Sequence, residues 1–175
     1  MKLIKRILPL LFGLAVFGWT WERTKAPPEP REGVLITLTM RSDVTDDIEL
    51  FYDTTGAGFR TEASVRRKLL SSIAVQELRF ELPSMDSLHG LRIDPGDHPI
   101  LLQMQSLRIE GPYRSLTWDA QDIIERFVVT NQMDSLALDP TTKLALLPCK
   151  GTDPFMTTGA SLTMATREVL SRGVQ

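Results

Sequence analysis

The residues that could act in catalysis do not form a hydrolase motif in this chain. Hydrolysis through a covalent intermediate needs a nucleophile activated by a neighbouring base, and glycoside hydrolysis needs two opposed carboxyl groups. None of the serines lies in a G-x-S-x-G sequence, and residues 64–68 (SVRRK) place a lysine four residues after Ser64 rather than three. We therefore expect no enzymatic activity, and glycoside processing is the least favoured functional alternative.

Carboxylates are concentrated near one loop, which suggests a site for a hard cation. Ca²⁺ takes six to eight oxygen ligands, and four aspartates fall within eleven residues of sequence. They are Asp43, Asp46, Asp47 and Asp53. Their spacing is not that of an EF-hand, and loop aspartates often cap turns. A structural calcium ion at these residues is one alternative. We expect no other cofactor, because His89, His98 and Cys149 show no zinc-ligand spacing.

Aromatic side chains in loops are the candidate ligand contacts. Carbohydrate-binding surfaces stack aromatic rings on the apolar faces of sugars and hold the hydroxyl groups with polar side chains. Phe59 and Tyr113 stand beside glycine-containing loop sequences, and Trp118 follows closely. Phe51 and Tyr52 lie in an alternating pattern, so one of them is expected to be buried. We predict that Phe59, Tyr113 and Trp118 contact a ligand.

An arginine and an aspartate two residues apart form the second candidate contact. Arg92 and Asp94 fall on one face of a predicted strand. We predict that Arg92 pairs with Asp94 or with Asp53 in a charge-assisted hydrogen-bond network, and ligand contact by Arg92 and Asp94 is the alternative. Residues 94–97 (DPGD) have the composition of a tight turn.

The elements that would position these residues are predicted to be β-strands. Apolar segments with period-two alternation or β-branched residues recur about every ten residues, with turn formers between them. They are residues 34–41, 48–53, 75–83, 88–95, 100–111, 127–130, 134–139 and 143–148. Because residues 88–95 and 100–111 flank Gly96 to Pro99, we predict that they form a hairpin. The pattern as a whole predicts an all-β protein, an antiparallel β-sandwich.

Few segments are typical of a helix. Residues 118–126 have helical spacing, with Asp119 as the expected N-cap. The basic run at residues 66–68 is interpreted as a solvated loop that could meet anionic glycan or lipid headgroups. Residues 161–175 are expected to form a short amphipathic tail.

The first residues predict export from the cytoplasm. Lys2, Lys5 and Arg6 precede an uncharged run at residues 7–21, so the following chain should lie outside the cytoplasm. We favour a retained signal-anchor, a transmembrane helix, over a cleaved signal peptide that would leave a secreted or periplasmic protein. The predicted domains are therefore the signal segment 1–21, a proline-rich tether 22–33, a β-sandwich 34–165 and a tail 166–175.

The charge of the chain argues against nucleic acid as a partner. Removing Lys2, Lys5 and Arg6 from the 20 lysines and arginines leaves 17 cations against 22 carboxylates. Binding to nucleic acid needs a basic surface. The single cysteine, Cys149, excludes an intramolecular disulfide and is expected to be a small buried side chain.

The order of motifs resembles a known group of domains. The motifs are DDIELFYDTTGAGFRTEASV, QELRFELP, LRIDPGDHP followed by LLQMQSLRIEG, and GTDPFM. This succession resembles extracytoplasmic β-sandwich accessory domains of bacterial envelope membrane proteins for polysaccharide and glycosyl transfer, which look like jelly-roll carbohydrate-binding modules. The resemblance covers residues 34 to about 158. It implies a jelly-roll-like fold and a cell-envelope glycan context.

Two functions are therefore expected as alternatives. The first is a membrane-tethered, non-catalytic module that binds envelope carbohydrate. The second is a tethered interaction domain that docks to a partner membrane protein. An exposed line of aromatic side chains would favour the glycan, whereas an exposed apolar patch would favour the protein partner.

Overall fold

The computed structural model describes residues 32–96, 98–129, 136–150, 153–159 and 161–170. The predicted signal segment 1–21 and most of the predicted tether lie outside the described residues. Among the described residues, no helix is both long and apolar enough to cross a membrane.

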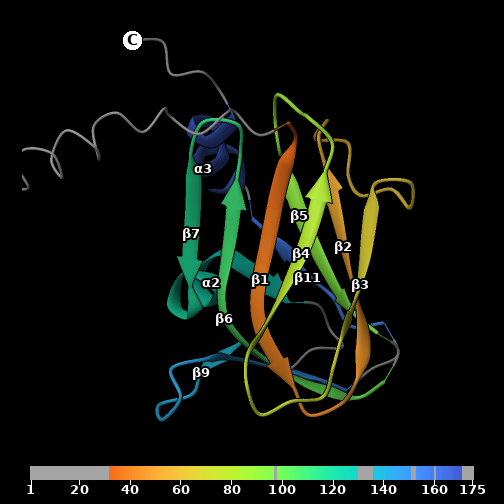
Figure 1. The fold of residues 1–175 in the computed structure, drawn as a ribbon, viewed down its shortest axis with the longest axis vertical. Coiled ribbons are helices and arrows are strands. Elements are labelled where there is room, and N and C mark those ends of the chain that lie inside the picture. Colours follow the sequence, from red (N-terminus) through yellow and green to blue (C-terminus); the bar gives the residue numbers. More distant parts are fainter. Residues whose placement is uncertain (1–31, 97, 130–135, 151–152, 160, 171–175) are drawn as a thin grey trace, which may run out of the picture. The chain divides into compact units, whose positions relative to one another are not determined.

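Two antiparallel sheets make up the fold, which confirms the prediction of an antiparallel all-β protein (Figure 1). The six-stranded sheet has the order β4-β1-β6-β10-β9, and β7 also pairs with β6. Its strands are β1 (Val34–Ser42), β4 (Gln76–Leu82), β6 (Ile100–Glu110), β7 (Ser115–Asp119), β9 (Ala137–Leu138) and β10 (Ala145–Cys149). The five-stranded sheet has the order β3-β2-β5-β11-β8. Its strands are β2 (Asp46–Asp53), β3 (Ser64–Leu69), β5 (Gly90–Pro95), β8 (Phe127–Val129) and β11 (Met156–Thr158).

The core lies between the two sheets and follows the period-two patterns of the strands. In β4, Leu78 and Phe80 are buried, whereas Arg79 and Glu81 between and beside them are exposed. In β2, Ile48 and Leu50 are buried in the same cluster. Fully burying such a side chain stabilises the fold by about 1.5–3 kcal/mol. Alternation thus assigned the inward face of these strands correctly.

The predicted hairpin between residues 88–95 and 100–111 is wrong. Strand β5 pairs with β2 and β11 in one sheet, whereas β6 pairs with β1, β7 and β10 in the other. The turn formers between the strands do reverse the chain. A reversal of this kind serves equally well for crossing from one sheet of a sandwich to the other, and the sequence pattern does not distinguish the two cases.

The basic run at residues 66–68 is part of a strand, not the predicted loop. Strand β3 pairs with β2 and forms an edge of the five-stranded sheet. Charged side chains on an edge strand discourage pairing with other chains. Arg67 also links the sheets, because its Nε donates to the Arg79 carbonyl oxygen in β4 at 2.9 Å.

Two helices complete the described fold. Helix α2 (Ala120–Arg126) begins after Asp119, whose side chain accepts a hydrogen bond from the Asp122 N–H at 2.9 Å, so the predicted N-cap is confirmed. The predicted helix started two residues too early, because Trp118 belongs to β7. Helix α3 (Ser161–Leu170) makes up the described part of the segment expected to be an amphipathic tail, and the predicted domain boundary at 165 falls inside it.

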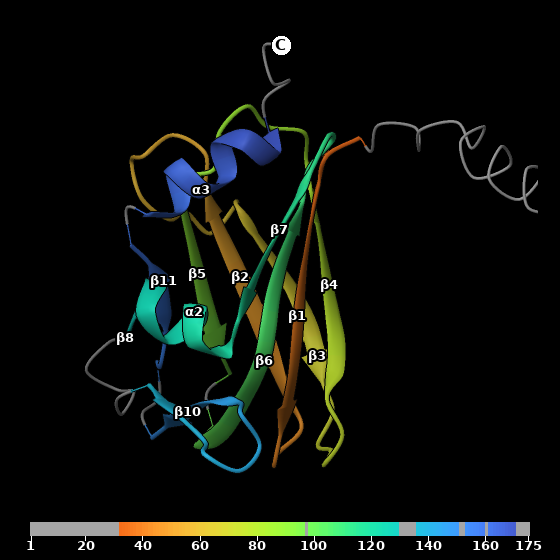
Figure 2. The ribbon, with the colours of Figure 1, turned by 90° about the vertical axis from the view of Figure 1, so that its left-hand side faces the viewer.

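The sandwich has two different ends. Helix α3 lies across one of them, which we call the capped end (Figure 2). Leu162, Val169 and Leu170 of α3 are buried in the core cluster, whereas Met164 is exposed. At the opposite end, which we call the open end, residues 43–45 connect β1 to β2 and residues 70–75 connect β3 to β4. Strand β1 runs from the capped end to the open end, a length of about 30 Å.

Candidate functional site

Trp118, one of the predicted ligand contacts, lies in the core. Its side chain is 2% exposed. Its ring meets the Phe127 ring edge-on, with 6.2 Å between centroids, and the Arg126 guanidinium lies 5.2 Å from its centroid. The expectation that Trp118 stacks on a ligand is therefore corrected, because its faces are already in contact with protein.

Phe59 and Tyr113 lie in separate loops of the capped end. Phe59 is half-buried, and its ring packs so closely on Gly90 that a Cβ there would lie 3.1 Å from the ring. Tyr113, in the turn between β6 and β7, is 45% exposed and is the only aromatic among the exposed large hydrophobic side chains of the described residues. The described surface thus contains no exposed line of aromatics.

Asp53 organises the loop that follows β2. The carboxylate of Asp53 is buried and accepts hydrogen bonds from the N–H groups of Thr55, Gly56 and Gly58 at 2.9–3.0 Å, and from the Thr55 hydroxyl at 3.1 Å. Burial acts to raise the pKa of Asp53, but these hydrogen bonds outweigh it and hold the pKa below its usual value. Asp53 is therefore a loop cap, and its predicted pairing with Arg92 does not form.

The four aspartates considered for calcium do not converge on one site. Asp43 and Asp53 flank opposite ends of β2, and Asp43 Oδ1 accepts from the Leu101 N–H at 3.0 Å. Asp46 and Asp47 are neighbours at the start of β2, where the Asp46 side chain is 10% exposed and Asp47 is exposed. No group of three or more His, Cys, Asp or Glu side chains within the described ranges is arranged to hold a metal ion. The calcium expectation is corrected on this geometry.

The predicted pairing of Arg92 with Asp94 is present on the outer face of the five-stranded sheet. Arg92 Nε and Nη2 donate to the two carboxylate oxygens of Asp94 at 2.7 and 2.5 Å. The guanidinium lies 3.9 Å from the ring centroid of Phe155 and 5.1 Å from that of Phe51. This arrangement combines a bidentate ion pair with cation–π contacts, so Arg92 is held in one orientation.

A groove of about 340 Å³ lies beside this pair, and we call it the acidic groove. It is lined by Asp46, Asp47, Glu49, Arg66, Asp94, Pro95, Gly96, His98 and Asp153. Burial raises the pKa of Asp94, although the hydrogen bonds from Arg92 act against it. Burial acts in the same direction on Glu49, but hydrogen bonds from Arg66 and Ser64 outweigh it and lower that pKa. The groove thus holds more carboxylates than cations.

One carboxylate of the acidic groove has an unsatisfied oxygen. The Asp46 side chain is 10% exposed, and its Oδ1 accepts from the Asp47 N–H at 2.8 Å. Its Oδ2 is buried without a hydrogen-bond partner, and His98 Nδ1 lies 3.6 Å away. A buried acceptor that lacks a partner is costly for the fold. Asp46 Oδ2 is therefore an acceptor that a hydrogen-bond donor from outside the protein could satisfy.

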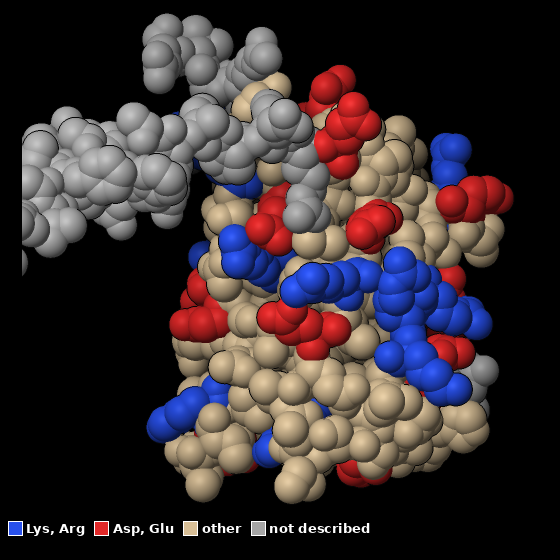
Figure 3. All heavy atoms as spheres, viewed as in Figure 1, with Lys and Arg blue, Asp and Glu red and all other residues tan. Residues whose placement is uncertain are grey.

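The outer face of the six-stranded sheet is charged in its middle (Figure 3). Arg79 pairs with Glu77 at 2.7 Å and Arg108 with Glu110 at 3.1 Å, and threonines lie between these pairs in a groove of about 460 Å³. Figure 3 also shows that the surface towards the open end is mainly uncharged. Each of these surface pairs joins a cation to a carboxylate, and surface pairs of this kind contribute little to stability.

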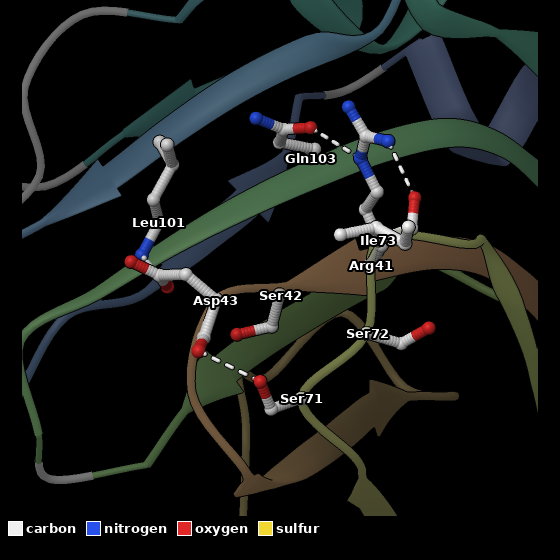
Figure 4. Close-up of a pocket in the computed structure, with 8 residues that line it drawn as sticks. All are labelled: Arg41, Ser42, Asp43, Ser71, Ser72, Ile73, Leu101 and Gln103. Atoms are coloured by element: carbon white, nitrogen blue, oxygen red, sulfur yellow. Dashed lines mark hydrogen bonds between the residues drawn. The ribbon is translucent and has the colours of Figure 1, made fainter.

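A third groove, of about 610 Å³, opens beside β1 at the open end, and we call it the Arg41 groove (Figure 4). Arg41 Nε donates to Gln103 Oε1 at 2.5 Å, and its Nη1 donates to the Ile73 carbonyl oxygen at 2.5 Å. The Ser71 hydroxyl donates to the Asp43 carbonyl oxygen at 2.8 Å. The groove therefore has hydrogen-bonded polar walls formed by both connecting loops.

The two loops of the open end are joined by their backbones. The Ser72 N–H donates to the Ser42 carbonyl oxygen at 3.0 Å, and the Ser71 N–H donates to the Thr45 hydroxyl at 2.9 Å. Ser42 and Ser71 form an isolated parallel bridge. These bonds restrict the loops to one conformation relative to each other.

Aliphatic side chains are exposed on these same loops. Of the eight exposed large hydrophobic side chains in the described residues, four belong to residues 43–45 and 70–75. They are Val44 (38% exposed), Leu70 (55%), Ile73 (92%) and Val75 (39%). Single exposed aliphatics are ordinary, but four on two joined loops indicate an interaction surface.

The sequence reasoning did not select the open end. Residues 69–75 (LLSSIAV) contain no charge and do not alternate, although they separate two strongly charged strands. The contrast between this uncharged segment and the charged strands on either side of it could have indicated an exposed apolar loop. Cys149, in turn, is buried as expected, and burial raises its thiol pKa to about 12, so it is not a reactive thiolate at neutral pH.

Comparison with known proteins adds no relative to this description: no family model, no curated protein and no solved structure matches the chain.

Proposed function

We propose that this chain is a membrane-tethered, non-catalytic module that docks a partner protein at its open end, outside the cytoplasm. The observation that carries the proposal is the exposure of Ile73, at 92%, together with Val44, Leu70 and Val75 on hydrogen-bonded loops. Between the two expected functions, exposed aliphatics and the lack of an aromatic line among the described residues favour the protein partner.

The hydrogen bonds of the open end support docking energetically. Binding costs free energy wherever loops must be ordered in the complex. Here Arg41 holds the carbonyl group of Ile73, and Ser71 holds that of Asp43, before any partner arrives. Because the loops are already ordered, they lose less conformational entropy when a partner buries the exposed aliphatic side chains. Each side chain that becomes fully buried contributes up to about 1.5–3 kcal/mol to binding.

The position of the open end also supports a partner in the extracytoplasmic space. The tether predicted at residues 22–33 joins β1 at the capped end, and β1 extends about 30 Å before the open end is reached. If residues 1–21 anchor the chain, the open end is the part of the module farthest along β1 from that anchor. The exposed aliphatics therefore lie at the end of β1 opposite to the one where the chain enters the domain.

The lining of the Arg41 groove defines the chemistry of the partner. Leu101 and Ile73 supply apolar surface, and the hydroxyl groups of Ser42, Ser71 and Ser72 supply donors and acceptors. Such a mixture fits an apolar anchor side chain surrounded by polar groups, the usual composition of a protein interface. Among the described residues, the lining of this groove has one cation, Arg41, and one carboxylate, Asp43, and so lacks the cluster of cations that binds anionic lipid headgroups.

Site-specific crosslinking in native membranes tests the proposal. A photo-reactive residue placed at Ile73 of the full-length chain should give one discrete protein adduct. The same residue at Val128, which is 61% exposed on β8, is the matched control and should give none. Leu70→Asp should abolish the adduct at position 73 without changing the thermal unfolding temperature. Equal adducts from both positions, or adducts with lipid alone, would contradict docking at the open end.

The jelly-roll topology implied by the resemblance remains part of this proposal. In the two sheets, strands in the same place of the order are consecutive in the chain: β4 with β3, β1 with β2, β6 with β5, and β10 with β11. Repeated crossing between facing sheets is characteristic of double-sheet jelly rolls. This order supports the relationship to jelly-roll modules of the envelope.

Carbohydrate binding is the second candidate function, and a separate observation favours it. The outer face of the five-stranded sheet presents Arg92, oriented by Phe51, Phe155 and Asp94, beside the acidic groove. Oriented carboxylates and guanidinium groups can bind sugar hydroxyl groups with defined geometry. The two candidate surfaces are distinct, so a protein partner and a glycan would not compete for the same residues.

A further inference from the structure

We propose that the acidic groove binds an amino sugar, with the protonated amine of the sugar directed to Asp46. This inference rests on the second candidate function, carbohydrate binding, and goes beyond it by naming the class of sugar. Four features of the groove carry it: its charge, the unsatisfied oxygen of Asp46, the composition of its walls, and the exposed His98 that covers the oxygen.

The charge of the groove selects a cationic ligand. Five carboxylates line it, and the cations nearest to them are Arg66 in the lining and Arg92 beside it. Arg66 pairs with Glu49 at 2.6 Å and Arg92 with Asp94 at 2.5 Å. A ligand that brings a positive charge lowers the repulsion among carboxylates crowded into about 340 Å³. An anionic sugar would raise it.

Asp46 supplies an observation independent of the charge count. Its Oδ2 is a carboxylate oxygen shielded from water that accepts no hydrogen bond in the described structure. Charge-assisted hydrogen bonds from an ammonium group are among the strongest available to such an atom. The close approach of Gly96, where a Cβ would fall 2.0 Å from Asp46 Oδ1, holds the side chain in place. The groove therefore contains a preformed acceptor for a donor that it does not itself provide.

The walls distinguish an amino sugar from a lysine side chain. Pro95 is the one apolar residue in the described lining, and all other side chains there are charged or ionisable, apart from Gly96. A lysine carries its ammonium group on a four-carbon stem that gains from apolar walls. An amino sugar carries hydroxyl groups around the ring, and these can donate to Asp47, Glu49 and Asp94 while the amine donates to Asp46.

A ligand can reach Asp46 by displacing the side chain of His98. Its side chain is 73% exposed and lies 3.6 Å from Asp46 Oδ2. An exposed side chain changes rotamer easily, on the nanosecond timescale. A ligand amine can therefore take the place of the imidazole nitrogen without disturbing β2, which holds Asp46 through its pairing with Leu69.

Calorimetric titration of the purified full-length chain with three tetrasaccharides tests the inference. The probes are β-1,4-linked tetramers of glucosamine, of N-acetylglucosamine and of glucose, used at about pH 6, where a primary amine is protonated. We expect the glucosamine tetramer to bind at least tenfold more tightly than the other two. Raising the salt concentration should weaken its binding, because charge attraction is screened.

Variants then locate the amine. Asp46→Asn keeps the size of the side chain and should weaken binding of the glucosamine tetramer about tenfold, with no change for the neutral tetramers. Asp86→Asn, at an exposed position outside the groove, is the matched control and should change affinity less than twofold. His98→Ala should retain or improve binding. If Asp46→Asn unfolds, the salt dependence of the unmodified chain still decides between a charge-directed and a neutral mode.

The outcomes separate this inference from the function beneath it. Equal binding of all three tetramers would overturn the amino-sugar inference and leave carbohydrate binding intact. A failure of every tetramer to bind would remove the carbohydrate function itself. Binding of a trilysine peptide as tight as that of the glucosamine tetramer would overturn the inference in favour of a basic protein segment.

Discussion

The two ends of the sandwich differ in where they place their apolar side chains. Both ends of two packed sheets leave the core accessible unless some part of the chain covers it. At the capped end, α3 places Leu162, Val169 and Leu170 into the core. At the open end, the loops place Leu70 and Ile73 outward. This contrast between the two ends is the reason for placing the proposed docking surface at the open end.

The largest expected effect comes from removing an apolar side chain at each end. Leu162→Ala should lower the free energy of unfolding by about 2–5 kcal/mol, because Leu162 is fully buried. Ile73→Ala should change it by no more than about 0.5 kcal/mol, since Ile73 is 92% exposed. Chemical denaturation of the full-length chain measures both. A comparable loss from Ile73→Ala would mean that the open end is also packed, and the contrast would fail.

The buried carboxylate of the capped end should have the next largest effect. Asp53→Asn should destabilise the fold by about 1.5–3 kcal/mol at neutral pH, because a charged acceptor of four hydrogen bonds is lost. The folded pKa of Asp53 is lowered from 3.8, so its contribution is complete above that pH and is lost as the pH falls through the folded pKa.

Denaturation of both proteins between pH 7 and pH 2 checks the Asp53 prediction. The difference in unfolding free energy between the unmodified chain and Asp53→Asn should close at the acidic end. Asp86→Asn, at an exposed position in the loop between β4 and β5, should show no difference at any pH. A difference for Asp53→Asn that stays constant down to pH 2 would show that the charge of the carboxylate is not what stabilises the loop.

The seating of α3 can be disturbed from the sheet. A Cβ at Gly111 would lie 2.4 Å from the Val169 carbonyl oxygen, so Gly111→Ala should push α3 away and cost about 1–3 kcal/mol. Gly159→Ala is the matched control, because a Cβ there would lie 3.8 Å from the Arg126 carbonyl oxygen, which is an ordinary van der Waals contact. Thermal unfolding distinguishes them. Equal stability of the two variants would mean that α3 does not rest on Gly111.

The smallest effect is expected from the hydrogen bonds of the open end. Ser71→Ala removes the bond from the hydroxyl to the Asp43 carbonyl oxygen and should cost about 0.5–1 kcal/mol. Hydrogen exchange at the Ser72 amide should accelerate at the same time, since that amide bonds to Ser42. Ser115→Ala, on an exposed position of β7, should leave exchange at Ser72 unchanged. Unaltered exchange in Ser71→Ala would show that the loops are ordered by other contacts.

The sequence predicted strands well and their partners poorly. Alternation identified the inward face of β4 because each strand meets the core on one side, a property that its own residues record. Whether β5 pairs with β6 depends on residues far along the chain, such as those of β2 and β11, and local turn formers do not contain that information. Strand β3 was missed because an edge strand can carry three successive basic residues.

The candidate sites were harder to predict for a related reason. Arg92 and Asp94 were paired correctly, because two residues on one face of a strand meet whatever the rest of the fold does. Trp118 was misplaced, since its burial depends on Phe127 and on the packing of α2. The open end was overlooked, because its two loops are distant in sequence and the contacts that join them leave no local pattern. Local chemistry was therefore predictable, and surface exposure was not.

The place of β1 in its sheet has a mechanical consequence. The chain enters the domain through Gly33 directly into β1, which is hydrogen-bonded to β4 along one edge and to β6 along the other. Tension applied at Gly33 along the strand would load both ladders in shear, so that many bonds must yield together rather than open one after another. A module held at this point can resist pulling by whatever it has bound before its own strands come apart.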